Sequence, residues 1–155
     1  MADAIDGRVV LREGMAFDAT PSSGHTIRMD AAPSVGGQDQ GARPMELLLL
    51  GLGGCTGMDV ISILRKMRQA VTGYEILLHA ERAEEHPRIF TKIVVEHVVR
   101  GRDMSESAVR KAVSLSAKRY CSASAMLSKA AVVEHRIRLV AEDALLAVPE
   151  SERQP

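Results

Sequence analysis

The order of elements that the sequence predicts is that of an α+β fold. Three short strand-like runs come first, followed by a long helix, two long strands, two helices and a last strand. The strands therefore cluster instead of alternating with helices, which is the pattern of α+β proteins. A chain of 155 residues is most simply one domain. We expect that domain over residues 1–140, followed by a flexible polar tail over residues 141–155.

The N-terminal part predicts a small antiparallel meander. Its β-type runs are separated by Gly14 and by the turn residues Pro21-Ser-Ser-Gly24, and they span residues 8–13, 15–19 and 25–30. A loop rich in glycine over residues 31–42 then leads to a helix. Pro44 suits the first turn of that helix, because its missing N–H would have no partner there.

Residues 45–68 predict the central helix, which has an almost charge-free first half. Four glycines stand in it, at positions 51, 53, 54 and 57. Each costs about 1 kcal/mol relative to alanine inside a helix. We expect this cost to be offset by close approach of another backbone, or by room for a small molecule beside Cys55.

The second half of the chain predicts a hairpin followed by helices and a strand. Residues 74–82 and 89–100 are strand-like, and Pro87 interrupts the segment between them. The sequence Asp103-Met-Ser-Glu106 has the form of a capping box, which predicts a helix from there to Tyr120. A short helix over residues 122–130 and a strand over 132–140 complete the order.

Composition excludes several classes of partner. Lys plus Arg and Asp plus Glu number 20 each, without a basic cluster, so we expect no nucleic-acid partner. The apolar segment Leu47–Met58 is shorter than the roughly 20 residues of a membrane span, so we expect no membrane insertion. The N-terminus lacks a signal pattern, which predicts a cytoplasmic protein with reduced thiols. Aromatic residues make up 3% of the chain, and so sparse a supply of bulky core residues favours an oligomer.

Cys55 and Cys121 are the whole cysteine complement, and each lies in a segment of small residues. They form no Cys-x-x-Cys motif and no zinc motif. The five histidines also lack ligand spacing, and we interpret them as surface or strand-edge residues. We therefore expect no metal and no cofactor. A dithiol that cycles between reduced and oxidised states is one reading of the pair, and small buried packing residues are the other.

Three segments together resemble the OsmC/Ohr family of thiol-dependent peroxidases, and most closely its YhfA-like branch. They are Arg43-Pro-Met-Glu-Leu-Leu-Leu-Leu-Gly-Leu-Gly-Gly-Cys55, Gly101-Arg-Asp103 and Ala117-Lys-Arg-Tyr-Cys-Ser-Ala-Ser-Ala-Met-Leu127. The resemblance runs from about Arg8 to Val140. It implies an OsmC-like intertwined homodimer, in which two β-sheets wrap two central helices and the active sites lie at the subunit interface.

The resemblance also implies a set of catalytic residues. Cys55 would attack a hydroperoxide, and Cys121 would resolve the sulfenic acid to a disulfide that an external dithiol reduces. The apolar and small residues expected around Cys55 favour organic hydroperoxides over hydrogen peroxide. The family places an acid immediately after the motif's proline, where this chain has Met45. Glu46, one residue on, is the candidate acid here. Arg12, Arg28 and Arg43 are candidates for the cation that would stabilise the Cys55 thiolate.

Two other functions compete with peroxide reduction in oxidative or osmotic stress. A non-catalytic small-molecule-binding or stress-associated dimer would retain the same fold. The segment Gly53-Gly-Cys-Thr-Gly57 also fits the Gly-x-Cys-x-Gly form of a hydrolase nucleophile elbow. The elbow needs a strand, a sharp turn and a helix, and the predicted order of strands does not supply them.

Overall fold

The computed structural model describes residues 3–142 and separates the chain into two compact units, Met1–Leu49 and Leu50–Pro155. The α+β class is confirmed by the order of elements. The single domain expected over residues 1–140 stays a prediction. Residue 141 ends the last strand, and the rest of the expected tail, from residue 143 onward, lies outside the described residues.

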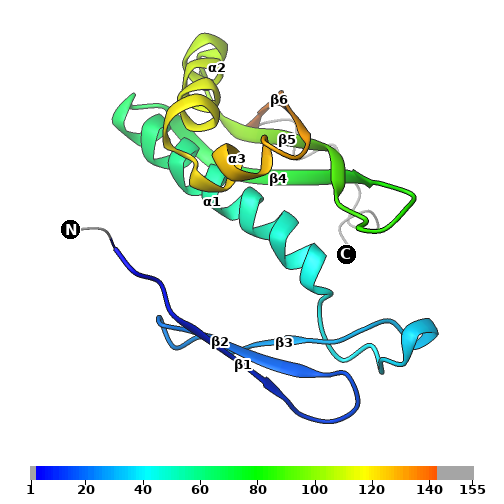
Figure 1. Cartoon of the computed structure of the whole chain (residues 1–155). Coiled ribbons are helices and arrows are strands. Elements are labelled where there is room, and N and C mark those ends of the chain that lie inside the picture. Colours follow the sequence, from blue (N-terminus) through cyan, green and yellow to red (C-terminus); the bar gives the residue numbers. More distant parts are fainter. Residues whose placement is uncertain (1–2, 143–155) are drawn as a thin grey trace. The chain divides into compact units, whose positions relative to one another are not determined.

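The first unit carries the predicted meander (Figure 1). Its strands are antiparallel in the order β1 (Gly7–Leu11), β2 (Phe17–Pro21) and β3 (Ile27–Met29), followed by the short 3₁₀ helix η1 (Pro33–Val35). Several of its apolar side chains are exposed, among them Val9 at 58% and Leu11 at 55%. This small sheet therefore leaves apolar surface open to a partner.

Asp30 organises the loop between the meander and the first helix. Its side chain is 3% exposed and accepts hydrogen bonds from the backbone N–H groups of Ala31, Gln38 and Gln40. These bonds, that of Gln40 foremost, lower the pKa of Asp30. Gly37 is required in this loop, because a Cβ there would lie 1.8 Å from the carbonyl oxygen of Ala31.

Helix α1 (Pro44–Lys66) begins where Pro44 predicts, and its first turn is capped by Glu46. The Glu46 carboxylate accepts a hydrogen bond of 2.9 Å from the backbone N–H of Arg43, which satisfies one of the donors that a helix start leaves unpaired. By length and composition α1 also qualifies as a membrane span. A core helix passes the same test, so this finding carries little weight alone.

Two of the four glycines in α1 allow close packing, against side chains and not against backbone. A Cβ on Gly53 would lie 2.8 Å from Leu78 Cδ1, and one on Gly57 would lie 2.8 Å from Ile76 Cδ1. The two glycines are one helical turn apart, so together they form a flat stripe that faces the next strand. Gly54 is different, since an added Cβ there would meet no atom within 4 Å.

The second unit is built on a three-stranded sheet in the order β4-β5-β6. The strands β4 (Ala70–Arg82) and β5 (Phe90–Arg102) form the predicted hairpin, and β6 (Val132–Ala141) pairs with β5 in parallel. Side chains of α1 and of helix α2 (Glu106–Leu115) meet those of β5 in one core cluster, whose buried members are Val60, Leu64, Val99, Val109, Ala112 and Val113. Hence these two helices pack on the same face of the sheet.

The segment after β5 departs from the prediction in two ways. The expected capping box is wrong, because Asp103 lies in a turn with a φ of 46° and Ser105 caps α2 by accepting from the N–H of Ala108. The α-helix also ends at Leu115, short of Tyr120. Residues Ser116–Tyr120 form the π-helix η2, and helix α3 (Ser122–Leu127) follows. Turns of π-helix are often found at functional sites.

The interpretation of the histidines as surface or edge residues is wrong for His97. It is completely buried on β5, with Tyr74 Oη 2.6 Å from its Nδ1 and His135 Nδ1 3.0 Å from its Nε2. Burial, with a smaller contribution from His135, lowers the pKa of His97 to about 4. The three side chains thus form a hydrogen-bonded row across β4, β5 and β6, and His97 is neutral at pH 7.

Candidate functional site

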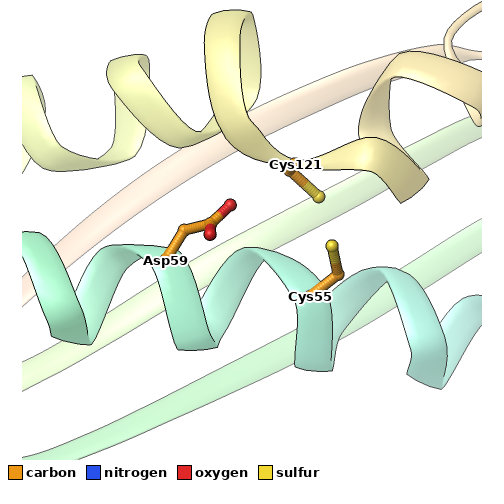
Figure 2. A group of neighbouring side chains, drawn as sticks. All are labelled: Cys55, Asp59 and Cys121. Carbon is orange, nitrogen blue, oxygen red and sulfur yellow. The ribbon is translucent and has the colours of Figure 1, made fainter. Parts of the chain in front are cut away.

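The second unit brings the two cysteines together, although they are far apart in the sequence. The sulfur atoms of Cys55 and Cys121 and a carboxylate oxygen of Asp59 all lie within 4.8 Å of one another. Figure 2 shows the sulfur of Cys55 on α1 pointing toward that of Cys121 on the facing segment, with Asp59 beside them. The arrangement is therefore a dithiol with an adjacent carboxylate.

Local structure explains why these three side chains meet. Cys55 and Asp59 are four residues apart on α1, so they lie on the same face of the helix. Cys121 is the residue between η2 and α3, and its backbone N–H donates to Ser116 O over 2.9 Å. The wide turn of the π-helix thus ends at the point where the chain presents the second sulfur.

The two cysteines differ in their surroundings. Cys121 is 3% exposed, whereas Cys55 is partly exposed. Burial raises the pKa of Cys121, and Cys55 adds to that rise. Hydrogen bonds oppose it, since Thr56 Oγ1 lies 3.3 Å from the Cys121 sulfur and the N–H of Ser124 donates to the same sulfur over 3.3 Å. Cys121 is therefore the more protected thiol, and Cys55 is the one that a solute reaches.

Asp59 is the site residue that the sequence reasoning missed. Its carboxylate Oδ2 accepts a hydrogen bond of 3.0 Å from the hydroxyl of Ser116, which is fully buried. The spacing Cys55-x-x-x-Asp59 on a predicted helix was the available signal, because residues four apart share a face. No motif along the chain contains the whole cluster, since Cys121 comes from a segment remote from Cys55 and Asp59.

A cavity of about 330 Å³ adjoins this cluster and shares Asp59 with it. The other residues that line it are Ser62, Ile63, Lys66, Leu115 and Tyr120. The lining combines the apolar residues Ile63 and Leu115 and the ring of Tyr120 with one residue of each charge, Lys66 and Asp59. The cavity therefore suits a small molecule with an apolar body and a polar or anionic end.

The structure places the remaining candidate residues in the first unit. Glu46 is exposed and caps α1. Arg12 and Arg28 both pair with Asp18, and Arg43 pairs with Asp39. Because the two units are described separately, the catalytic role of Glu46 stays a prediction, and so does the choice of an arginine as the cation.

Comparison with known proteins identifies the family. The model of the family described as OsmC-like protein matches residues 37–136, which include both cysteines and Asp59. The chain belongs to this family, as its resemblance to OsmC/Ohr proteins indicates.

Individual proteins show which members of the family this chain is similar to. Protein YhfA of Escherichia coli K12 is 44% identical over 137 residues, covering 88% of this chain and 99% of YhfA. A crystal structure of a hypothetical protein from Aquifex aeolicus VF5 shares 32% identity with a TM-score of 0.81, covering 91% of this chain and 99% of that one. The organic hydroperoxide resistance protein OhrB of Bacillus subtilis shares the fold, at 18% identity and a TM-score of 0.60 over 88% of this chain and 98% of OhrB.

Proposed function

We propose that this protein is a thiol-dependent hydroperoxide reductase in which Cys55 is the nucleophile and Cys121 is the resolving thiol. The observation that carries the proposal is the pair of sulfur atoms within 4.8 Å of one another, one partly exposed and the other buried. OsmC-like family membership supports it, as does the description of the fold relative OhrB as an organic hydroperoxide resistance protein.

The first step takes place at the accessible sulfur. The Cys55 thiolate attacks one oxygen of the hydroperoxide, the O–O bond breaks, and the leaving alkoxide takes a proton to become an alcohol. Cys55 is left as a sulfenic acid. Because Cys121 is buried and burial raises its pKa, it does not compete for the peroxide and remains a thiol.

The second step joins the two sulfurs. The Cys121 sulfur attacks the Cys55 sulfenic sulfur, giving a disulfide and releasing water, which protects Cys55 from further oxidation. The bonds from Thr56 and Ser124 to the Cys121 sulfur oppose the rise in its pKa and so aid its ionisation at this point. An external dithiol then reduces the disulfide by exchange. No cofactor enters this scheme.

The substrate is an organic hydroperoxide bound in the cavity beside Asp59. Ile63, Leu115 and Tyr120 provide apolar contact for an alkyl chain, and Lys66 provides a cation for an acidic end group. Hydrogen peroxide has neither feature and is strongly hydrated, so it gains little from such a cavity. Alkyl or fatty-acid hydroperoxides are therefore the preferred class, in protection against oxidative or osmotic stress.

The working form is a cytoplasmic homodimer with its active sites at the subunit interface. Leu50 and Met58 are eight residues apart and so lie on one side of α1, and their side chains are 56% and 74% exposed. So large an exposed fraction on an apolar helix marks an interaction surface, and a second copy of α1 would cover it.

A non-catalytic binding dimer is the second candidate. It is favoured by the carboxylate of Asp59, which lies beside the sulfurs, and by Met45 at the position where the family has an acid. Both features depart from a site built to hold a thiolate beside a cation.

Peroxide stoichiometry separates the two candidates. The fully reduced protein is mixed with cumene hydroperoxide, and its free thiols are titrated over time alongside intact mass. We expect two thiols to disappear per molecule of peroxide, with a mass change equal to the loss of two hydrogens. Repeated turnover with dihydrolipoamide should follow. Oxidation no faster than that of free cysteine, without turnover, would contradict the peroxidase.

The two cysteine variants assign the roles. Cys121→Ser should consume one equivalent of peroxide and accumulate a sulfenic acid that dimedone traps on Cys55. Cys55→Ser should react no faster than a simple thiol. Ala123→Ser, a small substitution in helix α3 two residues from Cys121, serves as the control and should keep turnover.

A further inference from the structure

Three side chains of types that bind zinc lie close together in the second unit. The sulfurs of Cys55 and Cys121 and a carboxylate oxygen of Asp59 lie within 4.8 Å of one another. Thiolate sulfur and carboxylate oxygen are both established zinc ligands, with bond lengths of about 2.3 Å and 2.0–2.2 Å. We propose that the reduced protein binds one zinc ion through Cys55, Asp59 and Cys121.

The geometry of the cluster is close to that of a tetrahedral site. With ordinary bond lengths, tetrahedral zinc holds two sulfurs about 3.7 Å apart, and a sulfur and an oxygen about 3.5 Å apart. Since no separation in the cluster exceeds 4.8 Å, no pair has to close by more than about 1.3 Å, which side-chain rotation provides. Cys55 and Asp59 are already aligned by one turn of α1.

Neighbouring residues hold two of the three proposed ligands, Asp59 and Cys121, in place by hydrogen bonds. The Ser116 hydroxyl donates to Oδ2 of Asp59 over 3.0 Å, and the other carboxylate oxygen remains available as a ligand. Thr56 Oγ1 and the N–H of Ser124 each lie 3.3 Å from the Cys121 sulfur. Hydrogen bonds of this kind orient metal ligands and strengthen their hold on the ion.

Charge and ligand type select a borderline-soft divalent ion. Two thiolates and a carboxylate bring three negative charges together, and none of the ion pairs described for residues 3–142 involves Asp59. A divalent cation offsets this charge. Sulfur ligands discriminate against Mg²⁺ and Ca²⁺, which prefer oxygen. Three protein ligands also leave the fourth tetrahedral position for a water molecule.

Zinc binding at this place is linked to the oxidation state of the dithiol. Binding replaces the two thiol protons, which are released to solvent. When a hydroperoxide takes two electrons from the sulfurs and becomes an alcohol and water, the disulfide that forms offers no thiolate, and the zinc leaves. The site itself needs only reduced cysteines, so it stands with either candidate function and does not depend on turnover.

Metal titration of the full-length reduced protein tests the proposal. The protein is reduced with a phosphine, freed of metal with a chelator, and titrated with Zn²⁺ against a chromophoric zinc indicator. Co²⁺ serves as the spectroscopic probe. We expect one Zn²⁺ per chain and a thiolate-to-cobalt charge-transfer band with tetrahedral d–d absorption. Protein oxidised to the disulfide with diamide should show neither.

Variants assign the ligands. Asp59→Asn should weaken zinc binding by about 10- to 100-fold or more, since mutation of residues that only hydrogen-bond a metal ligand already lowers metal affinity by that factor in known sites. Ser116→Ala should weaken it by a smaller factor. Cys121→Ser should abolish the cobalt charge-transfer band. Asp103→Asn, an exposed aspartate of the same unit, is the matched control and should bind as the unmodified protein does.

Three results would overturn the proposal. The first is a zinc affinity no higher than that of a simple dithiol such as dithiothreitol. The second is an Asp59→Asn variant that binds zinc as tightly as the Asp103→Asn control does. The third is a Cys121→Ser variant that still binds zinc. Far-ultraviolet circular dichroism and a count of two titratable thiols check that Asp59→Asn is folded. Should it fail that check, Ser116→Ala decides the role of Asp59 by the same comparison with the control.

Discussion

The buried row of Tyr74, His97 and His135 gives the protein a stability that depends on pH. In the folded protein the pKa of His97 is lowered from 6.5 to about 4. The unfolded chain therefore binds a proton in a range where the folded protein does not, and stability falls as the pH decreases from 6.5 toward 4. A difference of two to three pKa units corresponds to about 3 kcal/mol when complete. Between pH 7 and pH 5 the loss is about 2 kcal/mol.

Urea unfolding at fixed protein concentration, followed at pH 7 and at pH 5, measures this loss. The His97→Gln variant removes the titrating ring and keeps an amide that can bond Tyr74 and His135. Comparison of the two pH values within each protein cancels the cost of the substitution itself. We expect the variant to lose about 2 kcal/mol less than the unmodified protein between these pH values.

The exposed histidine His79 on β4 provides the control. His79→Gln should leave the pH dependence of the unmodified protein unchanged. The reasoning is refuted if His97→Gln and the unmodified protein lose the same stability between pH 7 and pH 5, because His97 would then titrate alike in the folded and unfolded states.

Three further predictions follow from local contacts. Thr56→Val removes a hydrogen bond that lowers the pKa of Cys121. The pH midpoint for alkylation of Cys121, measured in a Cys55→Ser background, should therefore move upward. An unchanged midpoint would contradict the contact. Gly53→Ala should gain less in urea unfolding than the about 1 kcal/mol that the higher helix propensity of alanine provides, because its Cβ would lie 2.8 Å from Leu78 Cδ1 and that side chain must shift; the full gain would contradict this packing. Leu64→Ala, at a fully buried position, should cost about 2–5 kcal/mol, and a loss below 1 kcal/mol would show that Leu64 is not in the core.

Much of the fold could be predicted from local sequence patterns. The meander, the hairpin of β4 and β5 and the start of α1 at Pro44 all depend on neighbouring residues, through turn formers, strand propensity and the lost N–H of proline. The capping of α2 was misassigned, since Asp103 and Ser105 are both good capping residues and only the turn at Asp103 decides between them. The helical periodicity of the sequence also predicted that α2 continues to Tyr120. A π-helical turn changes the backbone hydrogen bonding without changing the composition, so the sequence does not show where the α-helix ends.

The candidate site was accessible in part. The sequence directed attention to Cys55 and Cys121 as a pair. The spacing of Cys55 and Asp59 places them on one face of α1, but no local pattern shows that Cys121 meets them or that Ser116 binds Asp59, since these contacts join segments more than 50 residues apart. Nor did the sequence distinguish His97, which is buried in a hydrogen-bonded row, from the exposed His79 on the neighbouring strand.

The sequence alone determined most of the segments that become helix or strand, where α1 begins, and which two residues carry a thiol, because these depend on side-chain chemistry and on contacts within a few residues. The tertiary structure alone decided that the two sulfurs and a carboxylate meet, that one thiol is buried while the other is reached by solvent, and that a histidine is held neutral. Each of those properties is set by desolvation and by pairing between remote segments, and both arise when helices pack on a sheet.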